Sequence, residues 1–151
     1  MLSRTTEYAL RAVLFLAKSG GRPHTTQAIA EAVQVPEGYL AKVLSTLARA
    51  GVLNAQRGPS GGFTLARPPE RVTMLDVVDA LDALPKIKEC PLRLPEHAPV
   101  LCPLHRRLDK MVRTMRRSLA ATTVAKLLEE SVQPQARDFP PVAKPTVRGR
   151  A

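Results

Sequence analysis

The sequence has no tryptophan, and aromatic side chains make up only 3% of its 151 residues. Proteins that bind single-stranded nucleic acid stack the bases on aromatic side chains, so this scarcity argues against that class. No apolar run approaches the roughly 20 residues that a membrane span needs, and no signal-peptide pattern opens the chain. We therefore expect a cytoplasmic protein without a membrane partner. In a reducing compartment its two cysteines are expected to be free or metal-bound.

Signatures of catalysis are missing as well. The sequence contains no nucleophile elbow, phosphate-binding loop, paired catalytic carboxylates or Ser/His/Asp set, so we do not expect an enzyme. Positive charge, in contrast, is abundant: Lys and Arg number 23 against 13 Asp and Glu, a net charge of +10. Residues 1–72 and 103–132 are basic, whereas residues 73–102 are acidic. This distribution favours a polyanionic partner, most simply nucleic acid, although a basic surface without function has the same composition.

Three helices are predicted before residue 51. The first follows Ser3, a suitable N-cap, and its apolar residues recur at helical spacing. A short second helix begins at Thr25 or Thr26, and a third has Pro36 in its first turn and ends at Gly51. Two short helices joined by a tight connection are typical of a helix-turn-helix.

A β-hairpin is predicted directly after the third helix. Residues 52–56 and 63–66 alternate like strands, and between them lies the sequence Arg57-Gly58-Pro59-Ser60-Gly61-Gly62. Glycines allow positive φ at a hairpin tip and let the backbone approach another surface closely. In this position the hairpin is the wing of a winged helix, and Arg57 is suited to the negative potential of a DNA minor groove. A surface hairpin with an incidental arginine is the alternative.

The acidic part of the chain is predicted to hold a fourth helix, residues 73–84, with Leu75, Val78 and Leu81 facing inward. Three aspartates spaced by three residues are expected to form a solvated face of this helix: Asp76, Asp79 and Asp82. A proline-rich loop follows. Residues 103–130 are then predicted to form one long amphipathic helix, whose apolar stripe needs a partner to cover it. A homodimer through this helix meets that need.

We thus expect a mainly α fold with a small β-hairpin wing: a winged helix-turn-helix plus a long C-terminal dimerisation helix. The expected divisions are a DNA-binding domain, residues 1–72; a connecting helix and sensor loop, residues 73–102; the dimerisation helix, residues 103–131; and a disordered, basic, proline-rich tail, residues 132–151. A protein–protein adaptor that uses the same fold without DNA is a further alternative.

The residues around the proline-rich loop are candidates for metal binding. Cys90 and Cys102 flank the loop, and His105 lies three residues further on, at the spacing that brings two helical side chains to the same side. Thiolate and imidazole together suit zinc or an iron–sulfur cluster, and Glu96 and His97 are additional donors within the loop. Two reduced cysteines without a metal remain an alternative.

The chain resembles the Rrf-two family of winged-helix transcription regulators, which includes the iron–sulfur cluster biogenesis regulator and the nitric-oxide-sensing repressor. Three segments carry the resemblance: Glu7-Tyr8-Ala9-Leu10-Arg11-Ala12, Tyr39-Leu40 and, above all, Arg57-Gly58-Pro59-Ser60-Gly61-Gly62-Phe63. The resemblance implies a dimer that reads a palindromic operator in double-stranded DNA, most simply as a repressor.

Cluster-bearing members of this family carry three evenly spaced cysteines in the loop before the long helix. Cys90 and Cys102 match the outer two positions, but the middle position holds Glu96. His105 matches a histidine ligand of one branch of the family, and Glu7 matches a carboxylate that other branches donate from the first helix. The resemblance therefore implies a cluster held by Cys90, Cys102 and His105, with Glu7 or Glu96 as the fourth ligand. Mixed ligation favours [2Fe-2S] over [4Fe-4S]; zinc and redox-active thiols are the alternatives.

The same resemblance indicates which residues contact DNA. Arg57 is the expected minor-groove anchor, and Tyr39 and Lys42 lie near the start of the recognition helix, although Tyr39 also suits a packed core position and Lys42 a phosphate contact. Ala41 stands where the biogenesis regulator has an acidic residue for cytosine readout, so the resemblance does not carry that operator preference over to this chain. The full set of expected DNA contacts is Thr26, Gly38, Tyr39, Lys42, Arg57, Gly58, Ser60 and Gly61. A cofactor-free repressor that responds to a small molecule, thiol oxidation or a partner protein is the alternative function.

Overall fold

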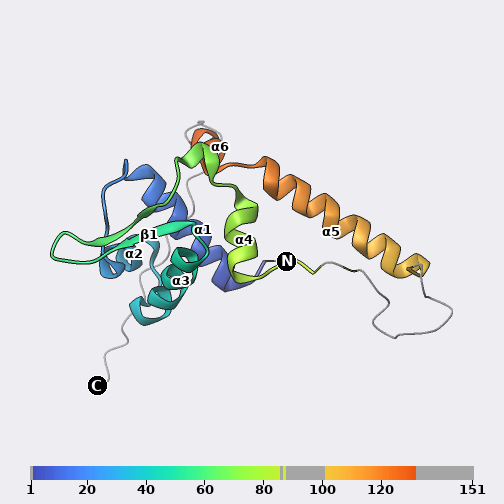
Figure 1. The fold of residues 1–151 in the computed structure, drawn as a ribbon, viewed down its shortest axis with the longest axis horizontal. Coiled ribbons are helices and arrows are strands. Elements are labelled where there is room, and N and C mark those ends of the chain that lie inside the picture. The colour runs from blue at the N-terminus through green and yellow to red at the C-terminus, as the bar shows by residue number, and fades with distance from the viewer. Residues whose placement is uncertain (1, 86, 88–100, 132–151) are drawn as a thin grey trace, which may run out of the picture.

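The computed structural model describes residues 2–85, 87 and 101–131 (Figure 1). Within these residues the fold is mainly α with one two-stranded antiparallel sheet, which confirms the expected fold class. Cys90, Glu96, most of the proline-rich loop and the tail lie outside the described residues. The elements are α1 (Arg4–Lys18), α2 (Thr26–Val33), α3 (Glu37–Arg49), β1 (Leu53–Gln56), β2 (Gly62–Leu65), a 3-10 turn (Pro69–Arg71), α4 (Met74–Leu81), α5 (Pro103–Ala121) and α6 (Val124–Ser131).

Side-chain caps fix where the first helices begin. Ser3 caps α1 as expected, because its side chain accepts a hydrogen bond from the amide of Thr6. Thr25, not Thr26, caps α2. The expectation for Pro36 was wrong by one position: it occupies the N-cap of α3 rather than its first turn, and its backbone is not yet helical.

The core lies where the inner faces of α1, α2, α3 and α4 meet. α1 and α3 each contribute four buried apolar residues, which in α3 are Leu40, Val43, Leu44 and Leu47. Since these positions form one stripe of a helix, the opposite face of α3 is left for solvent. In α4 Val78 is buried and Leu81 packs against the core, as expected, whereas the burial of Val77 was not expected and α4 ends at Leu81 rather than at residue 84.

The predicted hairpin is present, with strand bounds that differ by one residue from those expected. Leu53 pairs with Leu65 and Gln56 with Gly62, and the two strands are antiparallel. The segment before α2 adds to the base of the hairpin, since the amide of Phe63 donates to the carbonyl of His24 at 2.8 Å and the amide of His24 donates back to Phe63 at 3.1 Å. The base of the wing is therefore fixed to the body, and the tip extends beyond it (Figure 1).

The expectation of a single helix over residues 103–130 was wrong. The helix is interrupted at Thr122, whose backbone is extended, and Thr123 forms an antiparallel bridge with Thr73. The amide of Val124 donates to the carbonyl of Val72 at 2.8 Å, and the side chain of Val124 is buried. α6 consequently packs against α1 as part of the body, while α5 alone projects from it (Figure 1).

The three aspartates on and after α4 keep access to solvent as expected, with Asp82 exposed and the Asp76 and Asp79 side chains 35% and 34% exposed, but each is also paired, which was not expected. Asp79 accepts two hydrogen bonds from the guanidinium of Arg116 on α5, at 2.8 and 2.7 Å. Asp76 closes the N-terminal capping box of α4 and lies 3.3 Å from Arg67, and Asp82 accepts hydrogen bonds from the first turn of α1. The acidic spacing thus joins α4 to neighbouring elements, and the bidentate Asp79–Arg116 pair ties α5 to the body.

Candidate nucleic-acid interface

The outer face of α3 carries a row of exposed residues. Gly38, Lys42, Ser45 and Arg49 recur every three or four positions and are all exposed, directly opposite the buried stripe of the same helix. A helix that presents small and basic side chains along one free face can lie in a DNA major groove. Ser45 and Arg49 were missed in the sequence analysis, and their helical spacing from Lys42 is the signal that identifies them.

Tyr39 lies at the start of α3 and is 42% exposed, which excludes the alternative of a core tyrosine. It is nevertheless held in place. Its hydroxyl shares a hydrogen bond with the hydroxyl of Thr5, and its ring meets the ring of Tyr8 edge to face, with centroids 5.9 Å apart. A phenol fixed in this way at a helix N-terminus can reach a phosphate without losing side-chain entropy on binding.

The tip of the wing is exposed from Arg57 to Ser60, and within the described residues Arg57 has no ion-pair or hydrogen-bond partner. Its guanidinium is therefore available to a ligand. The amide of Gly61 donates to the carbonyl of Gly58 at 2.9 Å, which closes the turn. A Cβ at Gly61 would lie 2.3 Å from the carbonyl oxygen of Gln56, so the turn accepts no side chain there.

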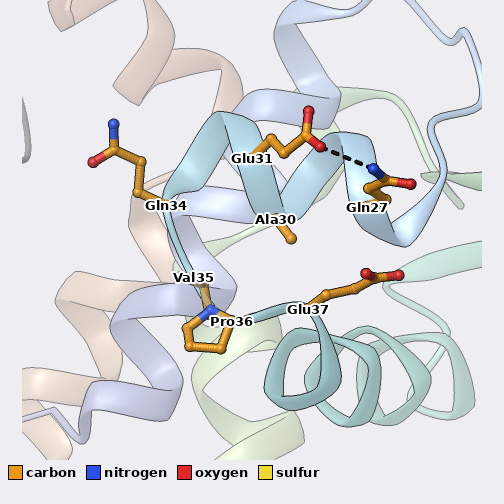
Figure 2. A pocket seen from close by; sticks show the side chains of 7 residues that line it. All are labelled: Gln27, Ala30, Glu31, Gln34, Val35, Pro36 and Glu37. Carbon is orange, nitrogen blue, oxygen red and sulfur yellow. Dashed lines mark hydrogen bonds between the residues drawn. The ribbon is translucent and has the colours of Figure 1, made fainter. Parts of the chain in front are cut away.

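One groove on the helix-turn-helix has two glutamates in its lining. This groove of about 530 Å³ lies between α2 and the start of α3, and Figure 2 shows the carboxylates of Glu31 and Glu37 beside it. Gln27 donates a hydrogen bond to Glu31 at 3.0 Å. Because carboxylates repel phosphate, the groove itself is not expected to bind DNA, although its lining residues Gln27 and Glu37 are sequence neighbours of Thr26 and Gly38.

The candidate metal ligands are only partly brought together. Cys102 is the N-cap of α5, and its Sγ lies 3.2 Å from Nδ1 of His105, so the two side chains share one side of the helix as predicted. Glu7 is exposed on α1, which lies in the body. The amino end of α5, which carries Cys102 and His105, is the end of α5 farther from the body (Figure 1). In the described ranges 2–85, 87 and 101–131, no three potential ligands form a metal-binding group.

The exposed row on α3 and the free arginine on a hairpin define a winged helix-turn-helix protein. The Rrf2 family model, described as an iron-dependent transcriptional regulator, matches residues 2–130. The chain belongs to this Rrf2 (Rrf-two) family of transcription regulators, which confirms the resemblance and the expectation that it is not an enzyme.

Named relatives and solved structures agree with this assignment. The chain is 30% identical to a "Putative HTH-type transcriptional regulator" of Aquifex aeolicus over 131 residues, which are 85% of this chain and 91% of the relative. It is 33% identical over 129 residues to the "Putative HTH-type transcriptional regulator BadM" of Rhodopseudomonas palustris, over 85% and 83% of the two chains.

Two structures show the same architecture. IscR of T. potens superposes with a TM-score of 0.72 at 24% identity, over 92% of this chain and 93% of that one. CymR, the global cysteine regulator of B. subtilis, superposes with a TM-score of 0.69 at 27% identity, over 86% and 97%. Among the helices of the described residues, none has the length and apolar character to cross a membrane.

Proposed function

We propose that this protein is a homodimeric repressor that binds a palindromic operator and whose affinity for DNA responds to an iron–sulfur cluster. The observation that carries the DNA-binding part is the exposed row of α3 residues together with the unpaired Arg57 at the wing tip. In this proposal α3 enters the major groove, and Gly38, Tyr39 and Lys42 face the DNA. Thr26 contacts the backbone, and the wing contributes Arg57, Gly58, Ser60 and Gly61 to the minor groove.

Substitution of Arg57 tests the DNA-binding part. We expect Arg57→Ala to weaken binding by roughly ten-fold or more and to lower the slope of log K against log salt by about one, because one phosphate-proximal cation is lost. The probe is the duplex that the full chain selects from a random-sequence pool, and binding is measured by fluorescence anisotropy over a salt series. Arg107→Ala, which removes the same charge from the exposed surface of α5, is the matched control. Equal losses in the two variants would contradict the proposed role of the wing.

The donor atoms of the described residues fit an iron–sulfur cluster in part. A thiol and an imidazole converge at Cys102 and His105, and both atom types ligate such clusters. In the proposal Cys90 and either Glu7 or Glu96 complete the set. Glu7 belongs to α1, which lies in the body, whereas the amino end of α5 is the end farther from the body (Figure 1), so a Glu7 ligand would come from the second copy of a dimer. A bound cluster would supply a redox- and ligand-sensitive centre at the end of the dimer helix.

Anaerobic purification tests the sensor part. We expect iron and sulfide in the freshly isolated protein and visible absorption, both of which are lost in Cys102→Ser and reduced in His105→Gln. Iron content and spectrum are read independently of DNA binding, and the affinity of each form for the selected duplex is then compared. Colourless protein that lacks iron and binds the duplex as tightly as any other preparation would refute the sensor part and leave the DNA-binding part intact.

A cofactor-free regulator that answers thiol oxidation, a small molecule or a partner protein is the second candidate. Two observations favour it: the Sγ of Cys102 lies 3.2 Å from Nδ1 of His105 at the N-terminus of α5, and CymR, a global cysteine regulator, is similar in structure at 27% identity. Under this candidate the iron-free protein changes its DNA affinity on mild oxidation, and a Cys90→Ser, Cys102→Ser double variant does not.

A further inference from the structure

The first turn of α1 contacts two other elements at once. Its residues 3–8 lie between the end of α4 and the start of α3, and hydrogen bonds link it to both. α1 also packs against α3 and α4 along the core. A segment bound on both sides can transmit a displacement of one neighbour to the other, because packed interfaces do not deform continuously.

At the end of α4, the carboxylate of Asp82 accepts hydrogen bonds from two hydroxyls of the first turn of α1. The Thr6 hydroxyl donates to Oδ2 of Asp82 at 2.7 Å, and the Ser3 hydroxyl donates to the same oxygen. The hydroxyl oxygen of Ser3 also accepts a hydrogen bond from the amide of Thr6 and so caps α1. Thr6 is fully buried, and it is the one buried polar residue within the described ranges. Hydrogen bonds from Ser3 first and Thr6 second lower the pKa of Asp82, so its carboxylate is charged at neutral pH.

On the α3 side, the same turn holds Tyr39. The Thr5 and Tyr39 hydroxyls are hydrogen-bonded, and the ring of Tyr8 packs against the edge of the Tyr39 ring. If Thr5 donates, the phenol keeps its own proton to donate outward. Tyr39 is 42% exposed, so that proton can reach a phosphate oxygen at the N-terminus of α3.

We propose that Thr5 and Asp82 are positioning residues for the DNA interface: Thr5 orients the Tyr39 hydroxyl toward the DNA backbone, and Asp82 fixes the turn that carries Thr5. The inference rests on the proposed DNA-binding function and deepens it, since it names the contacts through which α4 acts on the recognition helix. Neither residue touches DNA.

The direction in which DNA affinity changes when Asp82 is replaced distinguishes a positioning role from a simple charge effect. Loss of a negative charge from a protein that binds a polyanion strengthens binding. Asp82→Asn is nevertheless expected to weaken it by roughly three- to ten-fold, the worth of one misplaced hydrogen bond, because the neutral amide oxygen accepts from Ser3 and Thr6 more weakly than the carboxylate and Tyr39 loses its orientation. Asp109→Asn removes the same charge from an ion pair on α5 and is expected to leave affinity unchanged or slightly higher.

A double-mutant cycle measures whether the effect runs through Tyr39. Thr5→Val and Tyr39→Phe are each expected to weaken binding of the selected duplex by roughly three- to ten-fold, and the double variant is expected to be no weaker than Tyr39→Phe alone. Thr114→Val is the matched control, because the Thr114 hydroxyl bonds only its own helix on α5. Additive losses would overturn the inference, since they would place Thr5 and Tyr39 in separate roles.

The two tyrosines supply a readout that needs no DNA. They are the only two in the chain, which has no tryptophan, and they contact each other. The near-ultraviolet circular dichroism of the full chain above the phenylalanine bands therefore reports on this pair. We expect Asp82→Asn to change that signal although Asp82 touches neither ring, and Asp109→Asn and Thr114→Val to leave it unchanged. An unchanged signal in Asp82→Asn would overturn the inference.

The two proposals fail in different ways. If Arg57→Ala loses affinity while Thr5→Val and Asp82→Asn bind as tightly as the wild-type chain, the positioning role is wrong and the DNA-binding function stands. If the wild-type chain selects no duplex at all, the proposed function itself is wrong, and the positioning role falls with it.

Discussion

The Ser3 hydroxyl accepts a hydrogen bond from the amide of Thr6 and donates one to the carboxylate of Asp82. The same side chain therefore caps α1 and links α1 to the end of α4. The sequence predicted the first contact, because the N-cap preference is local. The second joins residues 79 positions apart and follows only from how α1 and α4 pack. Tyr39 shows the same division: its place at the start of α3 was predicted, whereas its contacts with Thr5 and Tyr8 were not.

The stability of the fold is expected to depend on the charge of Asp82. Its pKa in the folded state lies below the ordinary value of 3.8, chiefly because Ser3 donates to the carboxylate. A lowered folded-state pKa contributes stability that is fully present above the unfolded value and is lost as pH falls through the folded value. The difference in unfolding free energy between the wild-type chain and Asp82→Asn should therefore be constant near neutral pH and shrink below about pH 4. Urea denaturation of both proteins at several pH values measures this difference. A difference that stays constant as the pH falls well below 4 would contradict the prediction.

The wing is the element whose sequence signal was clearest, yet part of its glycine pattern has an internal cause. Gly62 has a φ of +149°, and a Cβ there would lie 2.3 Å from the carbonyl oxygen of His24. The close approach that glycine permits is thus made to the loop before α2, not to a ligand. His24 gave no signal in the sequence, because its backbone, rather than its side chain, forms the bridge to Phe63.

Alanine substitutions of two glycines test whether Gly62 is needed for its contact with His24. They separate that requirement from the conformational entropy that any glycine loses on folding. Gly62→Ala is expected to destabilise the fold by about 1–3 kcal/mol, since the new Cβ meets backbone and the φ is strained. Gly38→Ala is the control: its Cβ would meet nothing within 4 Å in α3, and it should stabilise the helix by about 0.5–1 kcal/mol. Chemical denaturation compares the two. Equal effects of the two substitutions would refute the explanation from the His24 contact.

The apolar periodicity predicted one helix where the structure has two, α5 and α6. The apolar spacing of residues 103–130 continues through the break, so a single helix was the simplest interpretation. Thr122 and Thr123 are both β-branched and favour extended backbone, but that preference is weak. The bridge between Thr123 and Thr73 and the burial of Val124 decide the matter, and both need α4 and its preceding turn in place.

At the scale of the whole molecule, α5 is an unusual helix because none of its residues is buried. Leu104, Leu108, Met111 and Met115 are exposed along one side, and Leu104 and Met111 exceed 60%. An apolar stripe on a helix that projects from the body fits a partner helix, in line with the proposed homodimer.

A charge in this stripe is expected to separate the protomers. If the proposed homodimer pairs through α5, Met111→Glu shifts the protein from dimer to monomer in sedimentation velocity and weakens binding of the proposed palindromic operator, which two linked copies would read. Thr114→Glu adds the same charge on a different side of the helix, where Thr114 is exposed, and should leave the mass unchanged. A wild-type chain that sediments as a monomer, or a Met111→Glu variant that remains a dimer, would argue against pairing through α5.

The sequence by itself determined the fold class, the helix-turn-helix and the wing, because helix caps, turn glycines and apolar periodicity act over a few residues. It also placed Cys102 and His105 on one side of a helix, since a separation of three positions fixes that geometry locally. Only the tertiary structure decided that α6 belongs to the body, that the α4 aspartates bind α1 and α5, and that the Tyr39 hydroxyl meets Thr5. Those contacts join residues far apart in the chain, and their partners are chosen by packing rather than by local preference.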